Sequence, residues 1–224
     1  MSKESRADRK KRAEKIRKRL VRKYPDAKCR LAFSTPFELL VATILAAQCT
    51  DDKVNEVTRK LFKEANTPQD FARMHLNKLK AAVRPTGFYN NKARAVKKTS
   101  QALLKRHGGR VPEGMDDLVA LPGVARKTAN VVRAVAFGLS AIITDTHLIR
   151  LSRRMGLTQN KDPVKIEQDL ADLLPEKKWS RFSHAMLFHG RAVCGAKKPR
   201  CDPCVVADLC PSAFRFPHFQ EKVR

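Results

Sequence analysis

The sequence is poor in aromatic residues, poor in acids and free of long apolar runs. Its 224 residues include 2 Tyr and 1 Trp, and alternating runs of β-branched residues are scarce, so a protein built mainly of strands is not expected. No segment approaches the roughly 18 apolar residues that a membrane-spanning helix needs. The first residues contain no apolar core of a secretory signal. We therefore expect a cytoplasmic, bacterial-type intracellular protein with no membrane partner.

The shortage of acids leaves a large positive charge. There are 22 Asp and Glu against 47 Lys and Arg, which gives a net charge of +25. Such a field favours polyanions, of which nucleic acid is the commonest, with an anionic membrane surface or an acidic protein as alternatives. The first 23 residues hold 12 Lys and Arg and three acids. We expect a basic arm or helix that either binds phosphates non-specifically or only aids solubility.

The six cysteines are unevenly distributed. Cys29 and Cys49 stand alone, which is typical of small buried apolar side chains. The other four lie within 17 residues, at Cys194, Cys201, Cys204 and Cys210. In an intracellular chain such a cluster indicates metal binding rather than disulfides. Four thiolates can bind one zinc ion or a [4Fe–4S] cluster. The single CxxC pair with wider gaps on both sides favours the cluster, and zinc remains the alternative.

The first gap between these cysteines carries three cations, Lys197, Lys198 and Arg200. A loop fixed by a metal group and carrying these charges is suited to contacting phosphates. The alternative is that they are solvated charges on a structural loop.

The rest of the chain has the apolar spacing of helices closed by Gly or Pro, which predicts an all-α fold. The predicted helices lie within residues 36–50, 67–83, 90–109, 112–123, 124–138, 146–157, 162–175 and 179–194.

The segment "LPGVARKTANVV" (residues 121–132) predicts a turn between two of these helices. The turn glycine Gly123 and the free N–H groups of the next helix could bind a phosphate. The first turn of that helix carries Arg126 and Lys127. The helix dipole and Arg126 disfavour the ammonium form of Lys127, and a partly neutral lysine is a nucleophile toward a carbonyl-like carbon such as C1′ of a damaged nucleotide. A surface lysine that contacts phosphate is the alternative.

Asp145 follows in "ITDTHLIR", directly before a predicted helix. It could serve only as a helix N-cap, or it could assist Lys127 as a carboxylate that accepts a proton or stabilises a cationic sugar.

These segments together resemble the endonuclease III family of the helix–hairpin–helix DNA glycosylase superfamily. The resemblance runs from about residue 24 to residue 211 and includes "TPFELLVATILAAQCTD", "RPTGFYNNKA", "LPGVARKTANVV", "TDTHLIRL", "FHGRAVC" and the four-cysteine loop. It implies two helical domains with a DNA-binding cleft between them. Residues 29–139 would form a six-helix barrel with the hairpin at about 115–137, and residues 1–28 and 140–224 would form an iron–sulfur domain.

The resemblance also implies an activity and its residues. The enzyme would be a bifunctional DNA glycosylase and AP lyase that removes oxidised pyrimidines, with Lys127 attacking C1′, Asp145 assisting, and β-elimination following. Gln48 would fill the gap left by the flipped base and Phe88 would be the opposite wedge. The four cysteines would hold a [4Fe–4S] cluster. His147 would contact the backbone or simply pack. The partner would be duplex DNA with a damaged pyrimidine or an abasic site, bound by a nucleoid-associated monomer.

One position departs from the family pattern. The family hairpin reads Gly-x-Gly, whereas this chain has Gly123, Val124 and Ala125. If residue 125 needs a positive φ, an alanine there costs about 1 kcal/mol or more, and its methyl group crowds the phosphate-binding N–H groups. Two alternatives therefore stay open: a DNA-binding iron–sulfur paralogue with little catalysis, and the monofunctional adenine-mismatch branch of the superfamily.

Overall fold

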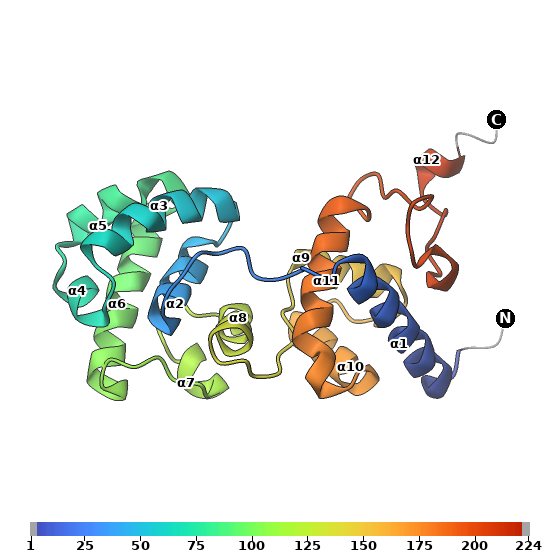
Figure 1. Cartoon of the computed structure of the whole chain (residues 1–224), viewed down its shortest axis with the longest axis horizontal. Coiled ribbons are helices and arrows are strands. Elements are labelled where there is room, and N and C mark those ends of the chain that lie inside the picture. Colours follow the sequence, from blue (N-terminus) through green and yellow to red (C-terminus); the bar gives the residue numbers. More distant parts are fainter. Residues whose placement is uncertain (1–3, 221–224) are drawn as a thin grey trace. The chain divides into compact units, whose positions relative to one another are not determined.

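The computed structural model describes residues 4–220, which form helices joined by turns with no strand among them (Figure 1). The all-α prediction is therefore confirmed. The α-helices are α1 (Arg6–Lys23), α2 (Pro36–Leu45), α3 (Asp51–Glu64), α4 (Pro68–Arg73), α5 (Leu76–Val83), α6 (Tyr89–His107), α7 (Met115–Val119), α8 (Arg126–Ala136), α9 (Thr146–Arg154), α10 (Pro163–Leu173), α11 (Trp179–Ala192) and α12 (Pro217–Gln220). The 3-10 helices are η1 (Arg84–Thr86), η2 (Glu176–Lys178) and η3 (Ala207–Leu209).

The chain divides into two compact units. One is continuous, Cys29–Leu139, and contains α2 to α8; we call it the hairpin unit. The other combines Met1–Lys28 with Ser140–Arg224 and contains α1 and α9 to α12; we call it the cysteine unit. No helix within residues 4–220 is long and apolar enough to cross a bilayer.

Helix α2 is the centre of the hairpin unit. Nine of its residues, Phe37–Leu45, are buried, and α3, α6 and α8 pack against it. The helix begins at a well-defined cap, because the Thr35 hydroxyl accepts a hydrogen bond from the Glu38 amide and the Glu38 carboxylate accepts one from the Ser34 amide. The apolar stretch expected over 36–50 is therefore helical up to Leu45, and a turn follows.

Two details of this unit differ from expectation. Residues 67–83 form two helices rather than one, because His75 adopts an extended conformation between α4 and α5. The Lys97 ammonium donates to the carbonyls of Ala72 and Met74 at this break, at 2.6 and 2.7 Å. Helix α3 was not predicted, although its Thr50 cap and its buried Val54, Val57 and Leu61 at helical spacing are visible in the sequence.

The cysteine unit has its own core. Ile16 and Leu20 of α1 are fully buried with apolar residues of α9, α10 and α11, among them Phe182. Helix α11 packs against α1 and α9, and α1 packs against α10 (Figure 1). The basic N-terminal segment is therefore a helix with one face anchored in a core. That helix begins at Ser5, whose side chain accepts a hydrogen bond from the Asp8 amide.

Candidate functional site

The hairpin between α7 and α8 is held by its apolar residues and by one hydroxyl. Leu121 and Val124 are buried, and the Val124 amide donates to the Leu121 carbonyl at 3.1 Å. The Thr99 hydroxyl of α6 donates to the Pro122 carbonyl, which fixes the turn to the neighbouring helix. The turn therefore presents the exposed residues Gly123 and Ala125 from a rigid base.

Gly123 is required by the geometry of this turn. Its φ is +79°, a region that L-residues rarely adopt. A Cβ atom at this position would lie 2.6 Å from the Cβ of Ala95 on α6. Both the backbone conformation and the close approach of α6 therefore exclude a side chain.

Ala125 does not carry the strain that the sequence suggested. It is the N-cap residue of α8 and has φ −83° and ψ 164°, an extended conformation that alanine adopts freely. The expectation of a positive φ with its cost is therefore wrong. The remaining effects of Ala125 come from its side chain. Alanine provides no side-chain cap for α8, and its methyl group is exposed at the turn.

Arg126 and Lys127 form the exposed first turn of α8, and this turn holds no acidic residue. No carboxylate of the described chain forms an ion pair with the Lys127 ammonium group, whereas the charge of Lys127 acts on the nearby thiol of Cys29. The hairpin unit therefore presents an accessible primary amine directly after a glycine turn.

Asp145 lies in the cysteine unit and is the N-cap of α9. Its Oδ1 accepts a hydrogen bond from the Leu148 amide at 2.7 Å, and the residue is 9% exposed. The geometry therefore shows that Asp145 caps the N-terminus of α9. It does not exclude a second role, since a carboxylate can accept further hydrogen bonds.

His147, two residues further on, is half-buried and packs closely on Gly190 of α11. Burial lowers the pKa of His147, and the nearby Arg150 and Arg191 act in the same direction, against Asp145. A neutral, packed histidine is what this geometry supports at neutral pH.

Gln48 and Phe88 share an uncommon backbone conformation. Gln48 has φ +52° in the turn after α2, and Phe88 has φ +49° as the N-cap of α6. Only one other non-glycine residue within 4–220, Phe214, has a positive φ. Both Gln48 and Phe88 are exposed, Phe88 by 63%. Strained, exposed positions of this kind occur preferentially at functional sites.

The four clustered cysteines follow α11 and are free thiols. Burial, together with the nearby Cys194, Cys201 and Cys210, raises the pKa of Cys204 to about 11. Burial also raises the pKa of Cys210, so the thiolate forms of Cys204 and Cys210 would be favoured by a nearby cation. Within residues 4–220, no three His, Cys, Asp or Glu side chains stand close enough to hold one metal ion.

Side chains that the sequence did not reveal surround these thiols. Arg154 of α9 donates to the Cys194 sulfur at 3.3 Å and to the Gly195 carbonyl at 2.7 Å. His189 of α11 is 1% exposed, and burial lowers its pKa to about 4. Its Nδ1 lies 3.1 Å from the Tyr24 hydroxyl and its Nε2 lies 3.4 Å from the Cys204 sulfur. If Cys204 is a thiolate, Nε2 must donate to it.

The cations predicted between Cys194 and Cys201 are exposed, as Lys197, Lys198 and Arg200 all are. The loop that carries them is well anchored. The Arg154 guanidinium donates to the Ala196 carbonyl, and His218 Nε2 lies 3.0 Å from the Pro199 carbonyl oxygen. Arg200 donates to the Ala192 carbonyl.

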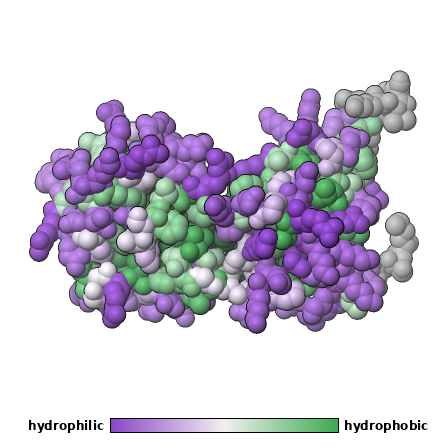
Figure 2. All heavy atoms as spheres, in the orientation of Figure 1, coloured by the Kyte–Doolittle hydropathy of each residue, from purple (hydrophilic) through white to green (hydrophobic). Residues whose placement is uncertain are grey.

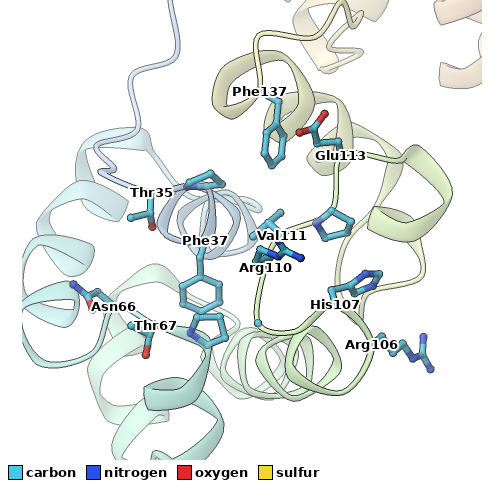
Figure 3. Close-up of a pocket in the computed structure, with 14 residues that line it drawn as sticks. Thr35, Phe37, Asn66, Thr67, Arg106, His107, Arg110, Val111, Glu113 and Phe137 are labelled. Atoms are coloured by element: carbon cyan, nitrogen blue, oxygen red, sulfur yellow. The ribbon is translucent and has the colours of Figure 1, made fainter.

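A cavity of about 830 Å³ lies elsewhere in the hairpin unit. It is formed by the starts of α2 and α4, the end of α6 and the segment after it (Figure 3). Phe37 and Phe137 face this hollow from different helices, whereas Arg106 points out of it (Figure 3). None of the residues singled out from the sequence lines it, so this cavity is not the candidate site.

Comparison with known proteins gives a consistent result. Residues 41–176 match the HhH-GPD superfamily of base excision DNA repair proteins. The chain is 48% identical to endonuclease III of Synechocystis sp. over 92% of this chain and 95% of the relative. It is 42% identical to endonuclease III of Escherichia coli K12 over 86% of this chain and 91% of the relative.

Two solved structures are also similar. One is a non-covalent complex of an endonuclease III with DNA, with a TM-score of 0.88, 40% identity and coverage of 92% of this chain and 97% of the other. The second is a trapped covalent intermediate of endonuclease III with DNA, with a TM-score of 0.88, 39% identity and coverage of 96% and 99%.

The hairpin geometry predicts that Gly123→Ala destabilises the protein more than Gly138→Ala. Gly138 also has a positive φ, +67°, but a Cβ there meets nothing within 4 Å, so it isolates the backbone cost of about 1–2 kcal/mol. Gly123→Ala adds the contact with Ala95 and should lose at least about 1 kcal/mol more. Urea unfolding followed by circular dichroism measures both, and equal losses would contradict the close approach of α6.

Proposed function

The chain belongs to the HhH-GPD superfamily of base excision DNA repair proteins, in its endonuclease III family, and we propose that Lys127 is the nucleophile with which it excises damaged pyrimidines from duplex DNA. It is a DNA glycosylase and AP lyase of base excision repair. The observation that carries the assignment of Lys127 is its exposed amine in the first turn of α8, directly after the glycine hairpin.

The reaction needs an amine with a free electron pair. Neutral Nζ of Lys127 attacks C1′ of the damaged nucleotide, the bond from C1′ to the base breaks, and the base leaves with the electron pair and takes up a proton. The Asp145 carboxylate supports the positive charge that develops on the sugar and accepts a proton from the attacking amine. The C1′–O4′ bond then breaks, O4′ takes up a proton, and the opened sugar is held as a Schiff base on Nζ. The Schiff base makes the C2′ hydrogen acidic, so loss of that proton and β-elimination break the C3′–O bond on the 3′ side of the lesion, and the phosphate leaves with the electron pair.

The base must first leave the helical stack. Gln48 would occupy the space of the extruded nucleotide, and Phe88 would stack from the other side. Their strained, exposed positions support these roles. Phe88 presents a large aromatic face, which suits it to stacking on the orphaned base.

Backbone contacts hold the duplex in place. The N–H groups of the turn at Gly123 and Ala125, together with Arg126, would bind phosphates at the start of α8. Lys197, Lys198 and Arg200 would contact phosphates from the cysteine loop, and His147 would contribute packing rather than charge. We assign residues 29–139 to a helical barrel domain with the hairpin at about 115–137, and the remaining residues to the cluster domain.

The four cysteines fit a [4Fe–4S] cluster. Burial disfavours the thiolate forms of Cys204 and Cys210 unless a cation compensates them, Arg154 donates to the Cys194 sulfur, and His189 Nε2 would donate to a Cys204 thiolate. When bound, the cluster would tie the four cysteines together and so fix the loop of Lys197, Lys198 and Arg200. The protein would act as a monomer, associated with the nucleoid, on oxidised pyrimidines and abasic sites.

Borohydride trapping tests the nucleophile. With a duplex that contains an oxidised pyrimidine, the parent protein should form a covalent adduct, and Lys127→Ala should form none because the imine cannot arise. Arg126→Ala, one residue away, should bind DNA more weakly but keep the adduct at saturating protein. An adduct that persists in Lys127→Ala would refute the assignment.

The metal group is tested by composition and colour. The purified protein should be yellow-brown, with broad visible absorption and about four irons and four sulfides per chain. Cys204→Ser should lose colour and iron, whereas Cys49→Ser, a partly buried cysteine of the hairpin unit, should keep both. A colourless protein that holds one zinc ion would overturn the proposal.

A further inference from the structure

Lys92 is a buried lysine that the reaction described above does not use. It lies in the first turns of α6, 5% exposed. Burial lowers the pKa of Lys92, and the only charge that opposes this shift is the neighbouring thiol of Cys49. A buried ammonium group without a carboxylate partner costs folding free energy. A contribution to the stability of the fold therefore does not explain why a lysine is buried at position 92.

Its one hydrogen bond goes to the turn that carries Phe88. The Lys92 ammonium donates to the Thr86 carbonyl at 2.7 Å, two residues before Phe88. Gly87 and Phe88 then both take positive φ, +70° and +49°. The Lys92 amide donates to the Phe88 carbonyl at 3.1 Å as an ordinary bond of the first turn of α6, so the bond to Thr86 is what the lysine side chain itself adds to this turn.

The same side chain reaches the second strained turn. Cys49, whose charge acts on Lys92, directly follows Gln48, which has φ +52°. Helix α6 also packs against α2, the helix that ends just before this turn. One buried ammonium group thus stands beside both exposed positive-φ residues of the hairpin unit.

We propose that Lys92 is a positioning residue that holds the Gln48 and Phe88 turns ready to insert into DNA when a base is flipped. The inference rests on the insertion roles given under the proposed function. Donation to a backbone carbonyl fixes the turn before the substrate arrives, so that binding energy is not spent on ordering it. A 1 Å loss of position at such a site is enough to slow a reaction strongly.

The test uses a matched lysine on the same helix. Lys92→Met keeps the length of the side chain and removes the donor and the charge. Lys97→Met does the same five residues later, where Lys97 also bonds backbone carbonyls, but at the break between α4 and α5. Lys92→Met should slow single-turnover base release by between about tenfold and a hundredfold without lowering the unfolding midpoint. Lys97→Met should leave the rate unchanged.

Amide hydrogen exchange supplies a readout that needs no activity. Lys92→Met should speed exchange in residues 46–50 and 84–90, and Lys97→Met should speed it in residues 72–76 instead. Equal rate losses in the two variants, or unchanged exchange near Gln48 and Phe88, would overturn the inference. A parent protein that shows no base release would refute the proposed function, while the exchange pattern would still decide the role of Lys92.

A second, independent feature is the outer face of α1. Apart from the exposed Lys10 and Lys23, its cations divide into two groups. The arginines at positions 6, 9, 12, 17 and 19 all form ion pairs with nearby acids. By contrast, Lys11, Lys15, Lys18 and Arg22 are exposed and form no ion pair within the described residues. We call these four residues the α1 stripe.

The α1 stripe follows helical geometry. Spacings of three and four residues place the four cations on one line about 16 Å long. The line lies opposite the buried Ala13, Ile16 and Leu20, which anchor the helix. In Figure 2, hydrophilic atoms cover the position that α1 occupies in Figure 1. The nearby Glu14, Asp8, Glu4 and Asp208 are hydrogen-bonded to Arg17, Ser5, Arg12 and Arg19, and of the stripe only Lys18 lies close enough to Glu14 to lower its pKa.

We infer that the α1 stripe binds the phosphate backbone of duplex DNA outside the lesion. A rigid row of cations on a DNA repair protein matches the evenly spaced charges of that polymer and releases its counterions. This surface belongs to the cysteine unit, whereas Lys127 belongs to the hairpin unit. Its cations would add affinity through phosphate contacts alone.

Salt dependence tests this inference. The variant Lys11→Gln, Lys15→Gln, Lys18→Gln and Arg22→Gln should reduce the slope of log affinity for undamaged duplex against log salt by about two to four. A control with glutamine at the exposed Lys60, Lys63, Lys98 and Lys105 loses the same charge and should keep the slope. If both variants showed the same slope, the change in salt dependence would come from net charge alone, and the inference would be overturned. Loss of binding to phosphatidylglycerol vesicles alone would instead identify a membrane surface.

Discussion

The hairpin unit depends on the burial of one helix. Nine consecutive residues of α2 are removed from water, and α3, α6 and α8 each pack on it. That burial fixes where the Gln48 turn begins, where α6 presents Phe88, and where α8 presents Lys127. The functional residues are themselves exposed and polar or strained, so they contribute little to the stability of this arrangement.

Several features of the hairpin unit cost stability at the place where function needs them. Gln48 and Phe88 hold left-handed backbone, and Lys92 holds a buried charge without a carboxylate. Each is supported by ordinary packing nearby, such as the fully buried Leu79, Val83 and Val96. Natural proteins violate local rules mainly at functional sites, which agrees with the roles proposed for these three residues.

The cysteine unit combines an apolar core with a group of partly buried thiols. Its apolar core, which includes Phe182 of α11, would fold an ordinary helical cluster, but burial disfavours the thiolate forms of Cys204 and Cys210. Arg154 of α9 donates to the Cys194 sulfur, and Nε2 of His189 on α11 lies 3.4 Å from the Cys204 sulfur. A bound metal group would remove the free-energy cost of forming these thiolates and would also fix the loop of Lys197, Lys198 and Arg200. The stability of this unit would then be linked to the proposed DNA contacts of that loop.

The sequence by itself determined the helical class, the cysteine set and the glycine turn before Lys127, because helix periodicity, ligand spacing and turn chemistry are local properties. It failed where the answer depended on neighbours. The sequence did not reveal that His75 breaks residues 67–83 into two helices, and it suggested strain at Ala125, which is extended. Only the tertiary structure placed Lys92 on the Thr86 carbonyl and His189 beside Cys204. Bonds from a side chain to a distant carbonyl or sulfur depend on how helices pack, and no local pattern in the chain specifies that packing.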